Sequence, residues 1–382
     1  MKRLVFLLVF AILLSCLPIT AAAAPLEVAG KSAVLMDMAT GTVLFEQNAH
    51  EKLPLASVTK VMTMLLIMEA IDDGRIHWDD SVTVSEAAAA KGGSQIYLKV
   101  GETMSVTDMF KSVAVSSAND CACALAEFIA GSEAAFVEKM NSRAKELGME
   151  NTHFINCTGL DDGENAKEHY SSAYDIALMS RELMANHPEI QKFTTIWMDT
   201  VRDGAFGLSN TNKLVRFYPG ATGLKTGFTS AAGYCLSATA RRDGLGLIAV
   251  VMGAKTSQER FNSCKQLLDF GFANYTLITP EIPGELSVPV KLGTESTVTA
   301  APAEDTKLLL DKSQKGEVTT TVTLEEEVTA PVSKGQKIGV LTVRVGEQVL
   351  AQVPMIAEKA VPRLTWWQLF LQVLQRLSMA KQ

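Results

Sequence analysis

The sequence has little histidine, and none of it is spaced as a zinc peptidase requires. The 382 residues include five histidines, with no H-x-x-x-H pair and no paired C-x-x-C motifs. His50-Glu51 is followed by Pro54, where the zinc-peptidase motif needs a second histidine. The remaining candidates for a metal set are Cys121, Cys123 and either His153 or His169. Because no recognised ligand spacing supports that set, we expect neither a metal nor a cofactor.

Basic charge is also scarce. Lys and Arg number 35 against 42 Asp and Glu, which gives a net charge of −7. Binding to nucleic acid calls for a basic patch, so the charge argues against a nucleic-acid partner. The sequence contains no G-x-S-x-G, which argues against the nucleophile elbow of the ordinary Ser-His-Asp hydrolases.

Cysteine is too sparse for a disulfide framework. The chain has six cysteines, and five remain once an N-terminal leader is removed, an odd number in a long chain. We expect most of the five to be small buried residues rather than partners in disulfides. They are Cys121, Cys123, Cys157, Cys235 and Cys264.

The N-terminus has the pattern of a secretory leader. Lys2-Arg3 is followed by an apolar run over 4–17 and then by a short run of alanines. We expect a signal peptide over 1–23, cut after Ala23, and an exported protein. A lipoprotein site at Cys16 is the competing interpretation. Beyond the leader, the length allows about two domains, and 47% hydrophobic residues can fill their cores.

Three short motifs follow one another along the chain: Ser57-Val58-Thr59-Lys60, Ser117-Ala118-Asn119 and Lys225-Thr226-Gly227. The pattern S-x-x-K alone is weak, because it also occurs at Ser142 and Ser378. Ser142 lies in a run of helix formers, and Ser378 lies four residues from the C-terminus, where chains usually fray. Order, spacing and context therefore select Ser57.

Ser57 has the context that nucleophilic catalysis needs. Pro54 favours a first helical turn, and residues 61–71 are apolar almost all round, which predicts a buried helix. Ser57 and Lys60 are then neighbours on one face. A serine hydroxyl needs a base, and Lys60 can act as one if burial and the helix N-terminus lower its pKa.

The second and third motifs predict a loop and a strand. Ser117 and Asn119 lie between two apolar stretches, which indicates a short loop between helices. Lys225 opens a strand pattern, and an antiparallel meander follows with a turn at Asp243-Gly244. Glycine at 227 lets a ligand backbone approach that strand closely. The charge and hydroxyl beside it suit a substrate carboxylate.

In this order the motifs resemble those of the low-molecular-mass penicillin-binding proteins that are serine-type D-alanyl-D-alanine carboxypeptidases. The segments over 156–161 and 169–175 also look like that family, so the resemblance covers nearly the whole chain. It implies an α/β (α+β) penicillin-recognising, transpeptidase-like domain over 24–277. A hairpin over 32–45 and the later meander would form its antiparallel sheet, flanked by helices.

The resemblance implies a catalytic role for three side chains. Ser57 would be the acylated nucleophile, Lys60 its base and Ser117 a proton relay to the leaving amine. The oxyanion hole would consist of the backbone N–H groups of Ser57 and Phe228. The implied reaction removes the terminal D-alanine from a peptidoglycan stem peptide through an acyl-enzyme, and β-lactams would acylate the same serine.

The resemblance also implies a set of substrate-binding residues. Asn119 would contact the substrate amide, while Lys225 and Thr226 would hold the terminal carboxylate. Gly227 and Phe228 continue that strand beside the substrate. Some relatives have histidine at the position of Phe228; only the backbone N–H is needed there, so the oxyanion role is kept.

The C-terminal part of the chain predicts a small β-sandwich domain and a tail. Over 278–356, short alternating segments are typical of strands and are separated by Gly, Pro and charged residues. The segments lie at 286–290, 318–324, 337–345 and 349–353. Over 357–382 the chain has four basic residues and a single acid, Glu358, with apolar residues at helical spacing from Trp367 on. This pattern predicts an amphipathic helix on the outer face of the cytoplasmic membrane, too short to span it. A helix packed on the β domain is the alternative.

Other functions stay open at this point. A catalytically dead penicillin-recognising scaffold would keep the fold without turnover, although Ser57, Lys60 and Lys225 are intact. Transpeptidase or endopeptidase activity would use the same acyl-enzyme. A class A β-lactamase is rejected, because the string over 182–186 lacks the leucine of the deacylating Glu-x-x-Leu-Asn motif.

Overall fold

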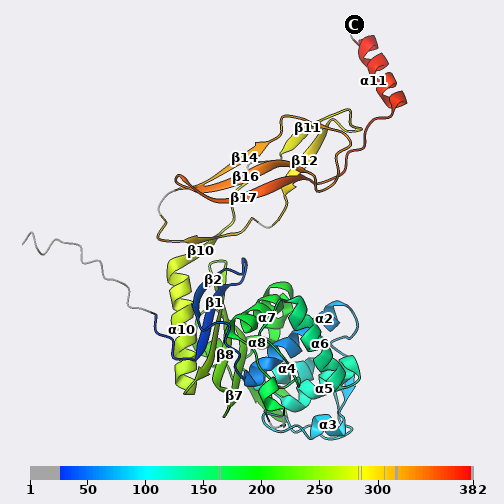
Figure 1. The fold of residues 1–382 in the computed structure, drawn as a ribbon. Helices are drawn as coiled ribbons and strands as arrows, with labels where there is room; N and C mark the ends of the chain where they lie inside the picture. Colours follow the sequence, from blue (N-terminus) through cyan, green and yellow to red (C-terminus); the bar gives the residue numbers. More distant parts are fainter. Residues whose placement is uncertain are drawn as a thin grey trace, which may run out of the picture.

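The structure is a computed structural model that describes residues 26–379, except for positions 162, 164, 283, 285, 305, 315 and 316. The expected leader over 1–23 and the lipoprotein candidate Cys16 lie outside the described residues. Figure 1 shows the chain as a compact N-terminal part, a slender β domain and a C-terminal helix.

A five-stranded antiparallel sheet of order β2-β1-β9-β8-β7 forms the centre of the N-terminal part. Its strands are β1 (Ser32–Asp37), β2 (Val43–Gln47), β7 (Ala221–Thr229), β8 (Gly233–Arg242) and β9 (Leu245–Ala254). The hairpin over 32–45 and the meander with its turn at Asp243-Gly244 are confirmed. The third motif, however, lies in the middle of β7, four residues after the strand begins.

Helices cover both faces of this sheet (Figure 1). α10 (Ser257–Asn274) packs on one face, and its start is fixed by a capping box between Thr256 and Glu259. Alternate residues of β9 point to opposite cores, with Leu247 facing α10 and Ile248 facing the helices on the other side. The predicted antiparallel sheet flanked by helices is therefore confirmed.

The larger core lies on the face opposite α10. The main helices there are α2 (Lys60–Asp72), α4 (Val106–Ser116), α5 (Asn119–Ala130), α6 (Glu133–Glu146) and α7 (Ala173–Asn186). Shorter elements complete this part: η1 (Ala56–Thr59), β3 (Ser81–Thr83), α3 (Glu86–Ala89), β4 (Thr103–Ser105), η2 (Ala166–Glu168), η3 (Pro188–Ile190), α8 (Gln191–Thr194), β5 (Met198–Val201), β6 (Phe206–Ser209) and α9 (Leu214–Phe217). α2 is buried over nearly its whole circumference, as its apolar sequence predicts.

The C-terminal part is all-β, as predicted. Its six-stranded sheet has the order β14-β16-β17-β12-β11-β15. The strands are β11 (Ser287–Lys291), β12 (Thr297–Pro302), β14 (Val318–Leu324), β15 (Val328–Thr329), β16 (Lys337–Val345) and β17 (Gln348–Ala357). The sequence patterns predicted four of these strands and missed β12 and β15. A separate ladder pairs β10 (Tyr275–Ile278) with β13 (Leu308–Asp311) and so ties the C-terminal part to the end of α10.

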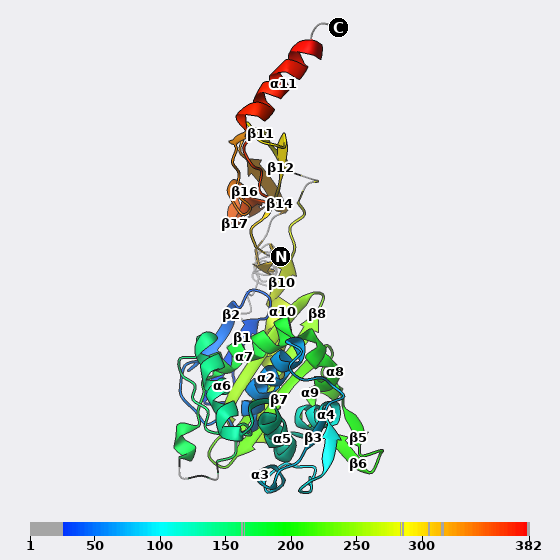
Figure 2. The same cartoon turned by 90° about the vertical axis from the view of Figure 1, so that its right-hand side faces the viewer.

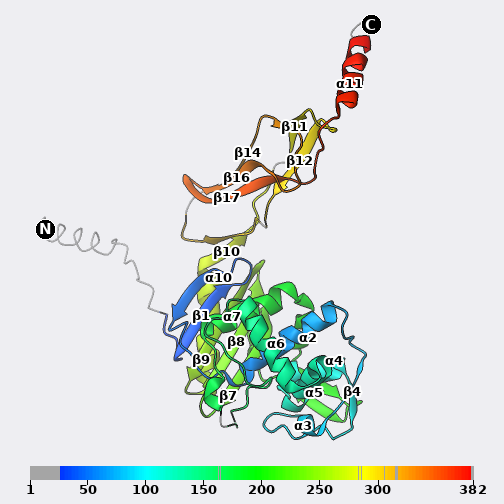
Figure 3. The ribbon, with the colours of Figure 1, turned by 45° about the vertical axis from the view of Figure 1, so that its right-hand side comes forward.

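The molecule is elongated. In Figures 2 and 3 the β domain stands between the N-terminal part and α11 (Trp366–Met379), and the C-terminus lies at the far end. Among the described residues, no helix has both the length and the apolar character needed to cross a bilayer.

Candidate active site

Ser57 and Lys60 meet at the start of α2. Ser57 lies in the short 3₁₀ turn η1, and Lys60 is the first residue of the α-helix that continues from it. The Lys60 ammonium nitrogen Nζ lies 3.1 Å from Ser57 Oγ and donates a second hydrogen bond of 2.7 Å to the Thr158 carbonyl. Lys60 is fully buried, while Ser57 is half-buried. The hydroxyl is thus accessible and the lysine is not.

Burial changes the protonation of both lysines in the site. Removal from water lowers the pKa of Lys60 to about 7, although Cys157 and Asp120 partly oppose the shift. Burial also lowers the pKa of Lys225 well below its ordinary value, and the charges of Lys60 and Arg260 lower it further. With a pKa near 7, Lys60 can accept a proton near neutral pH.

Ser117 and Asn119 lie where α4 ends and α5 begins. Ser117 caps α4 with a positive φ of 63°, and Asn119 is the first residue of α5. Both side chains are buried. The hydroxyl oxygen of Ser117 (Oγ) and the side-chain carbonyl oxygen of Asn119 (Oδ1) have no hydrogen-bond partner among the described residues. The Asn119 amide nitrogen is held by the Gly92 carbonyl at 2.7 Å. Two buried, unpartnered polar atoms in one short turn require an external partner such as a substrate.

Lys225 and Thr226 lie on β7, the edge strand that packs against the Ser57 turn. Lys225 Nζ donates a hydrogen bond of 2.9 Å to the Thr226 carbonyl. The Thr226 hydroxyl is hydrogen-bonded to the Thr211 hydroxyl, with the two oxygens 2.7 Å apart. Lys225 is buried, so its charge is held in a fixed place beside the strand. Phe228 is 53% exposed, and its ring lies against Tyr234 with centroids 4.3 Å apart.

The explanation of Gly227 drawn from the sequence is wrong. A Cβ at this position would lie 2.7 Å from the Leu55 carbonyl oxygen and 3.1 Å from the Ser57 backbone nitrogen. The space beside Gly227 is filled by the backbone of the Ser57 turn rather than by a ligand. Glycine is needed there so that the strand can approach this turn.

The elements that carry the three motifs pack against one another: β7 contacts the Ser57 turn, and α2 contacts β7, α4 and α5. The structure also shows residues that sequence reasoning missed. Thr158 holds Lys60, and a Cβ on the neighbouring Gly159 would lie 1.9 Å from the Ala56 carbonyl. The family-like segment over 156–161 was a usable signal for both.

Arg260 is the other missed residue. Arg260 lies near the start of α10. Its guanidinium group donates a hydrogen bond of 2.9 Å to the Gly227 carbonyl and one of 3.3 Å to the Cys235 carbonyl. Its Nε atom is buried without a partner among the described residues. No sequence pattern pointed to it, because a single arginine on a helix has no motif. No ion pair joins Arg260 to a carboxylate in the described part of the chain, so this buried cation adds positive potential beside the third motif.

The described residues include five cysteines and one group of acidic and histidine side chains that could act as ligands. All five cysteines in the described part of the chain are buried and unpaired, as predicted. One group of possible metal ligands, Glu69, Glu182 and His187, lies within 4.8 Å in the described residues. Arg143 forms ion pairs of 2.7 and 2.6 Å with the two glutamates, so this cluster already has a cation.

Comparison with known proteins agrees with the resemblance seen in the sequence. The family described as D-alanyl-D-alanine carboxypeptidase matches residues 19–256, and the C-terminal domain of penicillin-binding protein 5 matches residues 282–363. D-alanyl-D-alanine carboxypeptidase DacF of Bacillus subtilis is 44% identical over 335 residues, 86% of this chain and 85% of that protein.

Solved structures show the same likeness. Penicillin-binding protein 5 from Haemophilus influenzae superposes with a TM-score of 0.77 at 32% identity, over 89% of this chain and 99% of the other. Penicillin-binding protein D2 from Listeria monocytogenes, in its ampicillin-bound form, has a TM-score of 0.60 at 35% identity, over 65% of this chain and 100% of the other. The chain belongs to the D-alanyl-D-alanine carboxypeptidase family of serine peptidases.

Proposed function

We propose that this carboxypeptidase uses Ser57 as its nucleophile and Lys60 as the base that activates it. The supporting observation is the 3.1 Å contact between Lys60 Nζ and Ser57 Oγ, made by a lysine whose pKa burial lowers to about 7. A lysine with a pKa near neutral pH is unprotonated in a large share of molecules and can take the hydroxyl proton as Oγ attacks the substrate carbonyl.

The bond attacked is the amide between the last two D-alanines of a peptidoglycan stem peptide. Attack by Ser57 forms a tetrahedral intermediate, whose oxygen the backbone N–H groups of Ser57 and Phe228 would stabilise. One such donor is worth about 10²–10³ in rate. The Ser117 hydroxyl, unpartnered in the described residues, passes a proton to the departing D-alanine amine. Water then hydrolyses the acyl-enzyme and releases the shortened peptide.

The substrate is held at its carboxylate end. Lys225 and Thr226 bind the terminal carboxylate, with the buried charge of Arg260 behind the strand. Asn119 accepts a hydrogen bond from the substrate amide through Oδ1, which has no partner in the described residues. A cationic pocket selects peptides that end in a free carboxylate. β-Lactams carry a comparable carboxylate and an amide that the same serine can open.

We further propose that the enzyme works outside the cytoplasmic membrane and is held to its outer face by α11. Support comes from the leader pattern over 1–23 and from the exposed aromatic side chains of the helix. Trp366 is 73% exposed and Trp367 is 64% exposed, and Phe370 and Leu371 are exposed beside them. An apolar helix surface of this kind suits the interface of a bilayer.

The decisive experiment is incubation with a diacylated Lys-D-Ala-D-Ala peptide and measurement of free D-alanine. Penicillin should form a covalent adduct on Ser57, located by peptide mass spectrometry. Lys60→Ala should abolish the adduct and retain the fold. An adduct on Ser142, or none, would contradict the assignment. Acylation without release of D-alanine would favour a scaffold, and transfer to an added amine would show transpeptidase activity.

A further inference from the structure

A buried histidine contacts the turn that carries Ser57. His169 lies between η2 and α7 and is only 4% exposed. Its Nε2 atom lies 2.7 Å from the hydroxyl oxygen of Thr59 (Oγ1), and its Nδ1 atom is 3.1 Å from the backbone nitrogen of Ile155. Thr59 is fully buried and lies between Ser57 and Lys60 in the sequence. Both ring nitrogens of His169 are therefore held by the protein, one of them by the Ser57 turn.

These contacts determine which ring nitrogen carries the proton. A backbone N–H can only donate, so Nδ1 of His169 accepts from Ile155 and the neutral ring carries its proton on Nε2. Nε2 then donates to Thr59 Oγ1, which leaves the hydroxyl proton of Thr59 free to be donated onward. Burial, together with the charges of His153 and Lys60, lowers the pKa of His169 to about 4. The ring is therefore neutral near pH 7.

The Thr59 hydroxyl extends this contact to the residue that precedes Ser57. Thr59 Oγ1 donates a hydrogen bond of 2.8 Å to the Ala56 carbonyl. Ala56 is buried and has a φ of 48°, a left-handed conformation that alanine seldom adopts. Gly159 lies against the same carbonyl, since a Cβ at Gly159 would be 1.9 Å from the Ala56 oxygen. Contacts from distant segments therefore hold Ala56 in a conformation that it does not favour by itself.

The Ala56 carbonyl and the Ser57 N–H belong to the same peptide unit. Because this unit is planar, the direction of the carbonyl determines the direction of the N–H. The Ser57 N–H is one of the two donors of the proposed oxyanion hole. Such a donor stabilises the transition state only if it points at the position of the developing oxyanion. The hydrogen bonds that run from His169 to Ala56 thus act on this donor from a buried position.

We propose that His169 is a positioning residue that, through Thr59 and Ala56, fixes the Ser57 backbone N–H in the oxyanion hole. This inference rests on the proposed role of Ser57. Formation and hydrolysis of the acyl-enzyme both pass through a tetrahedral intermediate that bears the same oxyanion. Loss of the His169 contact should therefore slow both steps and lower kcat. KM should change little, because both steps slow together and His169 holds no part of the substrate.

The test measures kcat and KM for the release of D-alanine from a diacylated Lys-D-Ala-D-Ala peptide by the full-length protein. Thr59→Val keeps the side-chain volume and removes the hydroxyl, while His169→Leu removes both ring nitrogens. Each variant should lower kcat at least about tenfold, a part of the roughly 10²–10³ that one oxyanion donor contributes. An unchanged kcat in Thr59→Val, or a change confined to KM, would overturn the proposal.

A conservative variant tests the N–H group itself. His169→Gln places a side-chain amide N–H near the position of Nε2–H and should restore most of the rate that His169→Leu loses. A glutamine variant as slow as the leucine variant would contradict the proposal.

A double variant tests whether His169 acts through Thr59. In Thr59→Val the link to Ala56 is already broken, so the addition of His169→Leu should lower kcat little further. Losses that multiply would mean that His169 acts by another route, and the proposal would be wrong.

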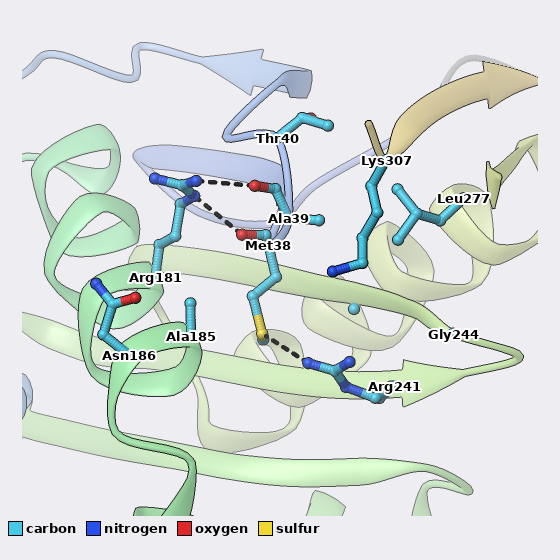
Figure 4. A pocket seen from close by; sticks show the side chains of 11 residues that line it. Met38, Ala39, Thr40, Arg181, Ala185, Asn186, Arg241, Gly244, Leu277 and Lys307 are labelled. Carbon is cyan, nitrogen blue, oxygen red and sulfur yellow. Dashed lines mark hydrogen bonds between the residues drawn. The ribbon is translucent and has the colours of Figure 1, made fainter. Parts of the chain in front are cut away.

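Arg181 provides the control for a general loss of stability. From α7 it donates hydrogen bonds of 2.9 and 2.8 Å to the carbonyls of Met38 and Ala39 and so holds the β1–β2 turn (Figure 4). The cavity that Arg181 lines has no residue of the three motifs among its described lining residues. Arg181→Gln should lower the melting temperature without lowering kcat. An equal loss of kcat in Arg181→Gln and His169→Leu would mean that destabilisation alone explains the effect.

Reaction with penicillin separates this inference from the proposed nucleophile. Peptide mass spectrometry should locate the adduct on Ser57 in the wild type and in His169→Leu, where the adduct should form more slowly. An adduct elsewhere in the wild type would overturn the proposed function and this inference with it. An adduct that forms on Ser57 at the wild-type rate in His169→Leu would overturn this inference alone.

Discussion

At the scale of single residues, the proposed role of Lys60 as the base makes the rate depend on its protonation state. Its pKa is lowered to about 7 because burial penalises the charged form. Acylation of Ser57 by penicillin should therefore accelerate as pH rises through about 7 and then level off. Stopped-flow acylation rates across this range test the prediction, and a flat profile would contradict it.

The same shift predicts how stability depends on pH. Between about 7 and 10.5 the unfolded chain holds a proton on Lys60 that the folded protein has largely lost. The free energy of unfolding should therefore rise with pH across this window. Lys60→Met, which keeps the volume and removes the charge, should flatten the rise. Denaturant titrations at several pH values measure it, with Lys139→Met as an exposed control.

The carboxylate role of Lys225 predicts a specific pattern of substrate loss. Lys225→Ala should weaken reaction with peptides that end in a free carboxylate at least about tenfold, because a charge-assisted contact contributes roughly 1.5–3 kcal/mol. The same peptides with an amidated end should lose much less. Steady-state kcat/KM values for the two peptides decide the matter. Equal losses would mean that Lys225 acts on the chemistry or on the fold.

Glu133 is linked to Lys60, the proposed base, through the backbone of residues 157 and 158. Its Oε1 atom accepts a hydrogen bond of 3.2 Å from the Cys157 backbone N–H, and Lys91 holds Oε2 at 2.5 Å. Cys157 precedes Thr158, whose carbonyl binds Lys60. Glu133→Gln should slow acylation several-fold and shift its apparent pKa, because the Thr158 carbonyl loses a fixed position. Glu138→Gln, exposed on the same helix, is the control and should change neither.

At the scale of secondary structure elements, Gly227 joins β7 to the Ser57 turn. Gly227→Ala would place a methyl group 2.7 Å from the Leu55 carbonyl, a contact that forces the backbones apart. Acylation should fall by at least about a hundredfold, since misplacement of catalytic groups by about 1 Å has that effect. Gly207→Ala on β6 meets nothing within 4 Å and should react normally. Normal acylation of Gly227→Ala would show that the turn can move without loss.

Some of these elements could be predicted from the sequence and others could not. Motif order and apolar patterns predicted α2, the hairpin, the meander and the meeting of the three motifs, because each depends on local periodicity or on a family likeness. The role of Gly227 could not be predicted, since it depends on which distant segment lies beside it. Thr158 and Arg260 were missed for the same reason: their partners are 98 and 33 residues away. β15 has only two residues, too few for a pattern.

At the scale of the whole molecule, the β domain separates the active site from α11 (Figures 2 and 3). Val361 is fully buried in the core of the β domain and pairs with Val332, so residues up to this point belong to that core. Leu364 still donates to the Leu292 carbonyl. A truncation that removes only the proposed anchor must therefore end after Leu364, rather than at the boundary of 357 expected from the sequence.

Cutting the chain after Leu364 should give an enzyme with the full activity and melting temperature of the complete protein on small peptides. The complete protein should sediment with anionic liposomes and lose part of that binding in high salt. Salt screens the basic residues, whereas the apolar contribution of the tryptophans persists. Trp366→Ala with Trp367→Ala should reduce binding at every salt concentration. Unchanged sedimentation after truncation would refute the anchor, and a lower melting temperature would instead indicate that α11 packs on the β domain.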